Sequence, residues 1–275
     1  MITASMVIYH NDREDLEKSI KSALKNKQLD TLYVIDNSKE SQNSILPKHE
    51  KIRYLYSKGK NLGFGRGHNI ALRKAISKGS NYHVILNPDI YFDENVFIRI
   101  RELMEKRENI GLVMPKIKFP NGEIQNLVKL LPTPFDLFQR RFLPRWEWAE
   151  KLNSRYEMDF ADKGVMVESP YLSGCFMFIR TEALKKVGLF DKNIFMYSED
   201  LDLTRRIHKK YKTVMHPEVE VYHKWERGSY KDKKLLMEQI KANIYYFNKY
   251  GWFIDKDREK TNKKIISKHL KVMKK

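Results

Sequence analysis

The stretch that decides the fold of this chain is His83-Val84-Ile85-Leu86-Asn87-Pro88-Asp89-Ile90-Tyr91. Its unbroken apolar run predicts a strand buried on both faces, and the proline ends that strand because it cannot donate to a ladder. Asp89 is therefore expected at the carboxyl end of a parallel strand, the edge at which open α/β sheets bind ligands. A carboxylate there suits Mg²⁺ or Mn²⁺ carrying a diphosphate, although an ordinary Asx-type turn also explains these residues.

The N-terminal residues predict the repeating unit of such a sheet. Apolar runs predict strands over 2–9 and 31–35, and Leu or Ile every four residues predicts a helix over 13–25, capped at Asn11-Asp12. Strand, helix and strand in this order form a right-handed βαβ unit. Asp36, directly after the second strand, is therefore expected at the same carboxyl edge as Asp89.

A glycine-rich loop follows a short strand predicted at 52–56. Residues 61–69 read Asn-Leu-Gly-Phe-Gly-Arg-Gly-His-Asn and precede a helical pattern over 70–78. Alternate glycines let the backbone approach a ligand closely, and the amides with Arg66 would face an anion. The spacing is neither the dinucleotide-binding fingerprint nor a Walker loop, so we disfavour both.

The rest of the chain continues the alternation of helices and strands. Residues 119–165 lose clear periodicity, which is typical of functional lids and mobile segments. Thr181 is the expected cap of a short helix that ends at Gly188. The predicted strands are 110–115, 170–180 and 219–222, and the predicted helices are 94–106 and 181–187.

Two further groups of polar residues stand at predicted element ends. Glu199, Asp200 and Asp202 cluster at a helix start, where the helix dipole favours them and where they also supply a candidate general base. His223 ends the last strand. A lone histidine of this kind is more often structural than a ligand.

Composition narrows the class of protein. The formal net charge is +18, and residues 231–275 contribute half of it, which favours anionic partners such as nucleic acid, anionic lipid or phosphorylated substrates. Cys175 is the single cysteine, so neither an internal disulfide nor a cysteine-based metal cluster is expected. No apolar run approaches the roughly 20 residues of a membrane span, and no secretory signal is recognisable, so we expect a cytoplasmic protein.

Six motifs in order resemble those of inverting family 2 glycosyltransferases with a GT-A fold, most closely the bacterial rhamnosyltransferase-like members. The resemblance implies an α/β domain over residues 1–230, with a Rossmann-like, mainly parallel sheet flanked by helices, and a basic, aromatic-containing helical extension over 231–275. The motifs are Val-Ile-Asp-Asn-Ser (34–38), the loop 61–69, Asn-Pro-Asp (87–89), Ser-Gly-Cys-Phe-Met-Phe-Ile-Arg (173–180), Phe-Met-Tyr-Ser-Glu-Asp-Leu-Asp-Leu-Thr-Arg-Arg (195–206) and His-Lys-Trp-Glu-Arg-Gly-Ser (223–229).

The resemblance implies a role for each donor-site residue. Asp36 would hydrogen-bond the pyrimidine base of a nucleotide-sugar, and the nucleotide pocket would be shaped by Asn61, Gly63 and Asn69, with Arg66 beside the anion. Asn87-Pro88-Asp89 takes the place of the family's Asp-x-Asp motif, which leaves Asp89 as the ligand of Mg²⁺ or Mn²⁺. Asn87 departs from the carboxylate that many members carry there. His223 matches the family's later metal-binding histidine.

The chemistry of such a transfer asks for the same groups. Release of a nucleoside diphosphate needs its charge neutralised, and the acceptor hydroxyl needs a base. The resembling enzymes use the Asp of a Glu-Asp motif, so Asp200 is the first candidate for the base and Glu199 the second. Asp202 and Arg205 look like supports that fix the start of the helix.

The expected function is transfer of a sugar from a nucleoside-diphosphate donor to a glycan or lipid-linked acceptor in cell-surface polysaccharide synthesis. dTDP-rhamnose is the favoured donor and a UDP-hexose the alternative. A sugar nucleotidyltransferase would instead carry a glycine-rich basic loop where this chain has residues 9–12. A non-catalytic nucleic-acid-binding protein is disfavoured because the aromatic residues cluster in one loop rather than along a sheet face, so we expect no nucleic-acid partner.

The C-terminal extension suggests where the protein works. Its lysines and aromatic residues suit an anionic headgroup layer, which predicts a peripheral protein at the inner face of the cell membrane. The alternative is that the aromatic residues pack the terminal helix against the core and the lysines stay in water. The apolar and aromatic residues in question are Ile244, Tyr245, Tyr246, Phe247, Tyr250, Trp252 and Phe253.

Overall fold

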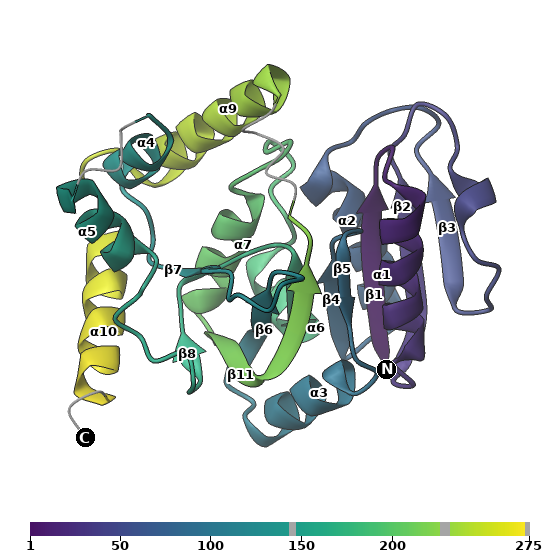
Figure 1. Cartoon of the computed structure of the whole chain (residues 1–275), viewed down its shortest axis with the longest axis horizontal. Helices are drawn as coiled ribbons and strands as arrows, with labels where there is room; N and C mark the ends of the chain where they lie inside the picture. Colours follow the sequence, from purple (N-terminus) through teal and green to yellow (C-terminus); the bar gives the residue numbers. More distant parts are fainter. Residues whose placement is uncertain (143–146, 226–231, 273–275) are drawn as a thin grey trace.

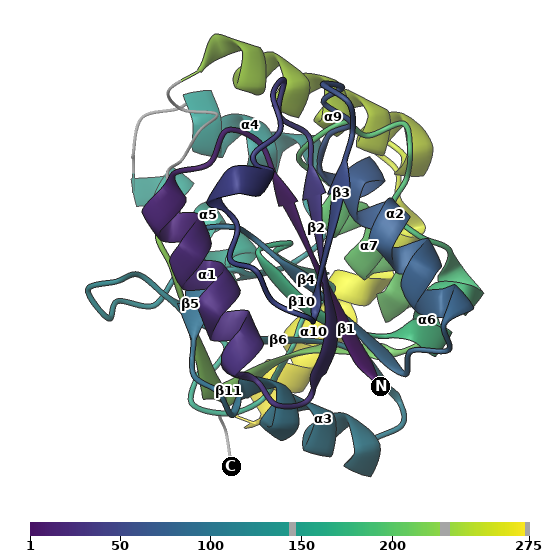
Figure 2. The ribbon, with the colours of Figure 1, turned by 90° about the vertical axis from the view of Figure 1, so that its right-hand side faces the viewer.

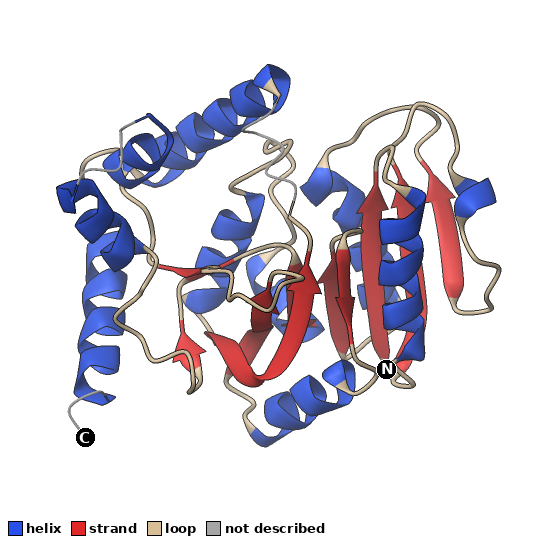
Figure 3. Cartoon of the chain, in the orientation of Figure 1, coloured by secondary structure: helices blue, strands red, loops and turns tan. Residues whose placement is uncertain are grey.

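A nine-stranded sheet runs through the centre of the molecule, with helices on both of its faces (Figure 1, Figure 3). The computed structural model describes residues 1–142, 147–225 and 232–272. The strands are β1 (Ile2–Ile8), β2 (Leu29–Asp36), β3 (Ile52–Tyr56), β4 (Tyr82–Leu86), β5 (Ile90–Phe92), β6 (Ile110–Lys118), β7 (Val128–Lys129), β8 (Val167–Glu168), β9 (Tyr171–Leu172), β10 (Phe176–Arg180) and β11 (Lys212–His223). The helices are α1 (Arg13–Lys25), α2 (Phe64–Ser77), α3 (Val96–Lys106), α4 (Pro134–Phe142), α5 (Glu147–Tyr156), α6 (Thr181–Val187), α7 (Glu199–His208), α9 (Lys233–Tyr250) and α10 (Lys256–Val272), with a 3₁₀ turn at Asn43–Ile45.

The sheet is mainly parallel, as expected, but three of its strands are reversed. Its order is β3-β2-β1-β4-β10-β6-β11-β5, with β8 pairing to β11. The first four strands are mutually parallel, and β11 is parallel to β6, whereas β10, β5 and β8 run antiparallel to their neighbours. A strand that is buried on both faces has the same apolar pattern whether it is parallel or antiparallel to its neighbours. The sequence therefore does not reveal which strands are reversed.

The helices divide between the two faces of the sheet. Viewed along the sheet edge, α1 lies on one side and α2, α6 and α7 lie on the other (Figure 2). The predicted N-cap of α1 is confirmed, because the Asp12 side chain accepts from the backbone N–H groups of Glu14 and Asp15. Thr181 was wrongly expected to cap α6, since its hydroxyl donates instead to the carbonyls of Ser80 and Asn81.

The C-terminal helices pack on the body of the protein. Tyr246 and Phe247 of α9 are buried in a small cluster with Leu131 and Leu201. The residues at the expected domain boundary, 230 and 231, lie outside the described part of the chain. Two helices of the extension thus contact the domain to which the resemblance assigns catalysis.

Strand β11 lies between β6 and β5 and pairs with both of them. Its first part pairs with β6 from Ile110 to Pro115, and after a register shift its end pairs with both β6 and β5. His223 thereby lies opposite Ile90, one residue beyond Asp89. The last strand of the sheet therefore brings the two predicted metal ligands together.

Candidate active site

The candidate residues meet at one edge of the sheet. Strands β2 and β4 flank β1 in parallel, so Asp36 and Asp89 leave the sheet at the same carboxyl edge. Strand β10 starts at this edge, because Phe176 pairs with Leu86 and the Asn87 amide donates to the Cys175 carbonyl. The residues just before β10, including Cys175, therefore lie next to the end of β4.

Asp36 is a fixed anion in a buried position. Its carboxylate accepts from the backbone amides of Ser38 and Gln42 and, at 2.6 Å, from the Tyr54 hydroxyl. Burial raises the pKa of Asp36, but these hydrogen bonds outweigh burial and hold the pKa below its usual range. The structure thus gives Asp36 partners, Gln42 and Tyr54, that no sequence motif indicated.

The glycine-rich loop contacts the segment that leads to Glu199. Gly63 has a φ of +79°, and a Cβ atom there would lie 2.1 Å from the Phe195 carbonyl oxygen. That same carbonyl accepts from the Phe64 amide at 3.0 Å, and the Asn61 side chain accepts from the Gly63 amide at 3.0 Å. Only glycine fits at position 63 because both the backbone angle and the close contact exclude a side chain.

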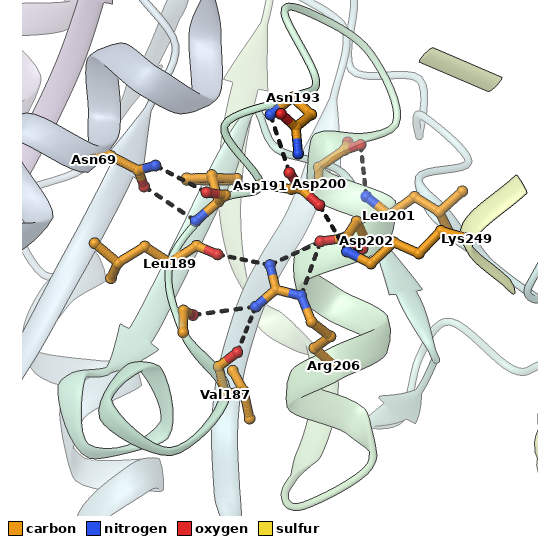
Figure 4. Close-up of polar contacts among 12 residues, drawn as sticks. Asn69, Val187, Leu189, Asp191, Asn193, Asp200, Leu201, Asp202, Arg206 and Lys249 are labelled. Atoms are coloured by element: carbon orange, nitrogen blue, oxygen red, sulfur yellow. Dashed lines mark hydrogen bonds and ion pairs between the residues drawn. The ribbon is translucent and has the colours of Figure 1, made fainter. Parts of the chain in front are cut away.

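Asn69 and Arg66 hold residues 188–198, which we call the base segment. The Asn69 amide group donates to the Phe190 carbonyl at 2.9 Å and accepts from the Phe190 N–H at 3.0 Å (Figure 4). The Arg66 guanidinium donates to the Lys192 carbonyl. These contacts, between residues far apart in the sequence, place both side chains against the base segment.

Asp89 and His223 form a pair whose atoms suit a divalent metal. The His223 Nε2 lies 3.4 Å from the Asp89 Oδ2, and its Nδ1 lies 3.0 Å from Gln125 Oε1. Asp89 Oδ1 is buried without a hydrogen-bond partner among the described residues. An orphaned carboxylate oxygen beside an oriented imidazole fits a Mg²⁺ or Mn²⁺ ligand set.

The pKa values of Asp89 and His223 are shifted in opposite directions. Burial disfavours the imidazolium, but the neighbouring Cys175 and Asp89 raise the pKa of His223 to about 10. Burial likewise raises the pKa of Asp89, but the hydrogen bond with His223 outweighs burial and lowers that pKa overall. Within residues 1–142, 147–225 and 232–272, no three His, Cys, Asp or Glu side chains gather as a metal cluster. A metal here would need further oxygen ligands, which a diphosphate and water supply.

A small hollow opens beside Asp89. It is lined by Asp15, Lys18, Asp89, Ile90, Tyr91, Pro120 and Lys224. The Lys18 ammonium lies 3.4 Å from the centre of the Tyr91 ring, and Lys224 pairs with Asp15 at 2.6 Å. Two cations next to a candidate metal ligand are the charges that a diphosphate needs. Lys18 lies outside the six motifs, and Lys224 lies within the motif 223–229 but was given no role there.

The two carboxyl groups of the Glu-Asp pair differ in their hydrogen bonds and in how far their pKa values are raised. The half-buried Asp200 accepts from the Gly174 and Leu201 amides, each at 2.8 Å, which partly offsets the rise in pKa that burial causes. Glu199 is only 5% exposed, and its Oε2 has no partner in the described structure. Burial and then the charge of Asp200 raise the pKa of Glu199 well above its usual range. Asp200 is therefore the member of the pair that is suited to accept a proton near neutral pH.

Arg205 has other partners than the sequence suggested, and Asp202 has partners outside its own helix. Arg205 does not support the start of α7, as expected, but is 2% exposed and pairs with Asp255 at 2.7 Å and Asp257 at 2.9 Å. Asp202 accepts from Arg206 and from Lys249 of α9 (Figure 4). It also accepts from the hydroxyl of Tyr250 in the same helix. Both residues therefore bind the C-terminal extension, an interaction that sequence spacing could not indicate.

Comparison with known proteins defines the class. The family model described as Glycosyl transferase family 2 matches residues 6–188, about two thirds of the chain. The chain belongs to this family, as the six motifs predicted.

Two curated glycosyltransferases are similar to this chain in sequence. An N-acetylglucosaminyl-diphospho-decaprenol L-rhamnosyltransferase of Mycobacterium tuberculosis is 23% identical over 228 residues, which cover 76% of this chain and 72% of the relative. The low-salt glycan biosynthesis hexosyltransferase Agl10 of Haloferax volcanii is 24% identical over 210 residues, 74% of this chain and 61% of the relative. The chain is similar to enzymes that transfer different sugars.

Solved structures confirm the GT-A fold. The crystal structure of GalNAc-T7 with UDP, GalNAc and Mn²⁺ superposes with a TM-score of 0.60 at 16% identity, over 82% of this chain and 44% of that one. The structure of S. aureus TarS gives a TM-score of 0.53 at 15% identity, over 86% of this chain and 39% of that one. The chain spans less than half of either structure.

Proposed function

We propose that this protein is an inverting, metal-dependent glycosyltransferase that moves a sugar from a nucleoside diphosphate to an acceptor hydroxyl. The observation that carries the proposal is the Asp89 Oδ1 beside His223, which has no hydrogen-bond partner in the described part of the chain. It lies at the sheet edge where β4 and the start of β10 meet and where the Gly174 amide donates to Asp200. The Mn²⁺ named with the GalNAc-T7 structure supports the choice of metal. dTDP-L-rhamnose is the donor we favour, because the mycobacterial relative is named as an L-rhamnosyltransferase, and a UDP-hexose is the alternative.

The residues of the site divide the reaction between them. Asp89 and His223 would hold the metal, which when bound neutralises charge on the leaving diphosphate. Lys18 and Lys224 face the same hollow and add positive charge there. Asp200 accepts the proton of the acceptor hydroxyl as the acceptor oxygen bonds to the anomeric carbon and the bond to the diphosphate breaks. Attack opposite the leaving group inverts the configuration of that carbon.

A thermal-shift panel tests the donor site. The purified chain is heated with dTDP, UDP, GDP or ADP, with and without Mn²⁺. At about 100 times its Kd, the matching nucleotide stabilises the fold by about 2.7 kcal/mol, which raises Tm by roughly 5–10 °C. We expect this shift for dTDP or UDP only when Mn²⁺ is present. If none of the four nucleotides raises Tm, the proposed function is contradicted.

We further propose that the acceptor is a lipid-linked or polysaccharide glycan reached from the inner membrane surface. Tyr246 and Phe247 pack against the body, as the packing alternative predicted, but the turn between α9 and α10 does not. There Trp252 is 37%, Phe253 87% and Ile254 77% exposed. Across residues 1–142, 147–225 and 232–272, no helix is long and apolar enough to cross a bilayer.

The neighbourhood of this turn favours a lipid surface. Arg258 donates to the carbonyls of Phe253 and Pro132, which ties the turn to the start of α4. Three more large apolar residues of α4 and α5 are exposed, and the rings of two of them, Phe135 and Trp148, stack. The extension also carries nine more basic than acidic residues. Exposed aromatic residues beside lysines are suited to the headgroup region of anionic lipid.

Vesicle flotation tests this second proposal. We expect the protein to float with phosphatidylglycerol vesicles, less so as salt rises, and to float poorly after replacing both Phe253 and Ile254 by serine. Burial of each side chain contributes about 1.5–3 kcal/mol, so partitioning should fall by about tenfold or more. Met237→Ser, an exposed apolar residue near the other end of α9, is the matched control. Equal recovery of the wild type with neutral and anionic vesicles would leave no support for an anionic surface.

A further inference from the structure

We infer that helix α9 of the C-terminal extension positions the catalytic base, through Asn243, Tyr245 and Lys249. The inference rests on the proposed function, because it concerns the base that this function assigns to Asp200. These three residues touch the base segment and the first turn of α7, not the reacting atoms. They are therefore positioning residues.

The first observation is the hydroxyl of Ser198. Ser198 is the N-cap of α7, and serine at an N-cap normally accepts from an amide of its own helix. Here the side chain makes no capping hydrogen bond, and its hydroxyl donates instead to Asn243 Oδ1 at 2.8 Å. The residue that opens the base-bearing helix is thus held by α9.

The second observation is the backbone at the same point. Tyr197 and Ser198 both have left-handed backbones, with φ of 68° and 59°. For residues other than glycine, each such conformation costs roughly 1–3 kcal/mol and persists only where the surrounding structure holds it. Asp200 follows within two residues, so release of this bend would change the direction of its carboxylate. The bond to Asn243 acts directly on the bend.

The third observation is an ionic bridge across the base segment. Lys249 Nζ lies 2.8 Å from Asp191 Oδ2 and 2.7 Å from Asp202 Oδ1, so it ties the segment to α7 (Figure 4). The Tyr245 hydroxyl accepts from Asn193 at 2.9 Å and donates to Asp191 at 3.0 Å. Burial opposes ionisation of Asp191 and of Lys249, but their contacts lower the pKa of the first and raise that of the second.

Other contacts hold the base segment from the body of the protein. Asn69 of α2 binds Phe190, and Arg206 of α7 binds the carbonyls of Val187 and Leu189 (Figure 4). These contacts fix the beginning of the segment, whereas its end at Ser198 is bound by α9. If Lys249 is lost, Asp202 remains paired with Arg206 and is not left as an unpaired buried charge. We therefore expect the fold to tolerate substitutions in α9. Substitutions in α9 should therefore change the orientation of Asp200 more than the stability of the fold.

Kinetics of Asn243→Ala separate positioning from general stability. We expect kcat to fall about tenfold or more, because small misplacements of reacting groups are costly, while the KM of the donor stays near that of the wild type. The acid limb of the kcat profile should move to higher pH as Asp200 loses backbone donors. Ser198→Ala should have a similar effect, and the double variant should be no worse than either single variant.

Two further variants control the experiment. Lys241→Ala removes an exposed lysine of the same helix that pairs locally with Glu238, and we expect activity within about twofold of the wild type. Tyr245→Phe keeps the ring and removes only the hydroxyl, so it tests the same contact region if Asn243→Ala does not fold. We expect it to lower kcat as well.

The outcomes separate this inference from the proposed function. If the wild type transfers sugar and both Asn243→Ala and Tyr245→Phe keep kcat per folded molecule within about twofold, the inference is overturned and the function stands. If the wild type transfers no sugar from any donor, the function fails, and hydrogen exchange decides the inference. Faster exchange of the amides of residues 199–201 in Asn243→Ala supports positioning by α9, and unchanged exchange overturns it.

Discussion

Asp200→Asn is expected to lower kcat by about a hundredfold or more while donor affinity stays near that of the wild type. Asparagine is nearly isosteric with aspartate but cannot take up a proton at neutral pH. The wild-type carboxylate accepts from the Gly174 and Leu201 amides, so the variant keeps one of these bonds and holds the side chain close to its place. Measurement of kcat, of the donor KM and of nucleotide binding by calorimetry checks the result.

The neighbouring carboxyl provides the matched control. Burial and the charge of Asp200 raise the pKa of Glu199, which favours its uncharged form, and Glu199→Gln has the shape of that form. We expect this variant to retain most of its turnover. Because burial raises the pKa of Asp200, wild-type activity should fall as the pH drops through that pKa. If Glu199→Gln is the inactive variant and Asp200→Asn the active one, the two roles are exchanged.

The second large effect is expected at the sheet edge. Asp89→Ala should abolish transfer, with a loss of at least about a thousandfold, because it removes the only carboxylate in the proposed metal pair. The fold should survive, because Asp89 lies in the turn after β4 rather than within a strand. Loss of the Mn²⁺-dependent thermal shift with dTDP or UDP would report the effect independently of turnover.

Asp15→Ala is the control for Asp89. Asp15 lines the same hollow and pairs with Lys224, so its removal changes the local charge equally without removing a proposed metal ligand. We expect this variant to retain most of the activity. Chelation gives a separate check, because full turnover of the wild type in excess EDTA would refute metal dependence.

The sequence predicted those parts of the fold that depend on local order. Strands over residues 2–8 and 82–86 are mainly apolar runs, and the positions of Asp36 and Asp89 follow from where parallel strands end. The direction of β10 was not predictable, because a strand buried on both faces carries no mark of its neighbours' direction. The helices α4 and α5 were missed because residues 119–165 showed no clear period.

The site was predicted less completely than the fold. Motifs named Asp89, Asp200 and His223, but not the groups that hold them, such as Gln125 for His223. Arg205 was misread because a basic residue six positions after Glu199 looks like a local support of the helix, whereas its partner Asp255 lies fifty residues further along the chain. Pairings over such distances depend on tertiary packing, which a single sequence does not display. The side chains of residues 139–142 and the motif residues 226–229 lie outside the part of the structure that is described.

The path of β11 also sets the order in which the site can assemble. Among the described residues β5 pairs only with β11, so the turn that carries Asp89 stays unanchored on that side until the last strand has joined the sheet. The glycine-rich loop and Asp89 of a nascent chain therefore leave the ribosome well before His223 does. Contacts between residues this far apart form late, since closing a long loop costs entropy before the contact stabilises anything. Under the proposed function, a metal-bound donor would therefore bind only to molecules whose synthesis has passed the final strand.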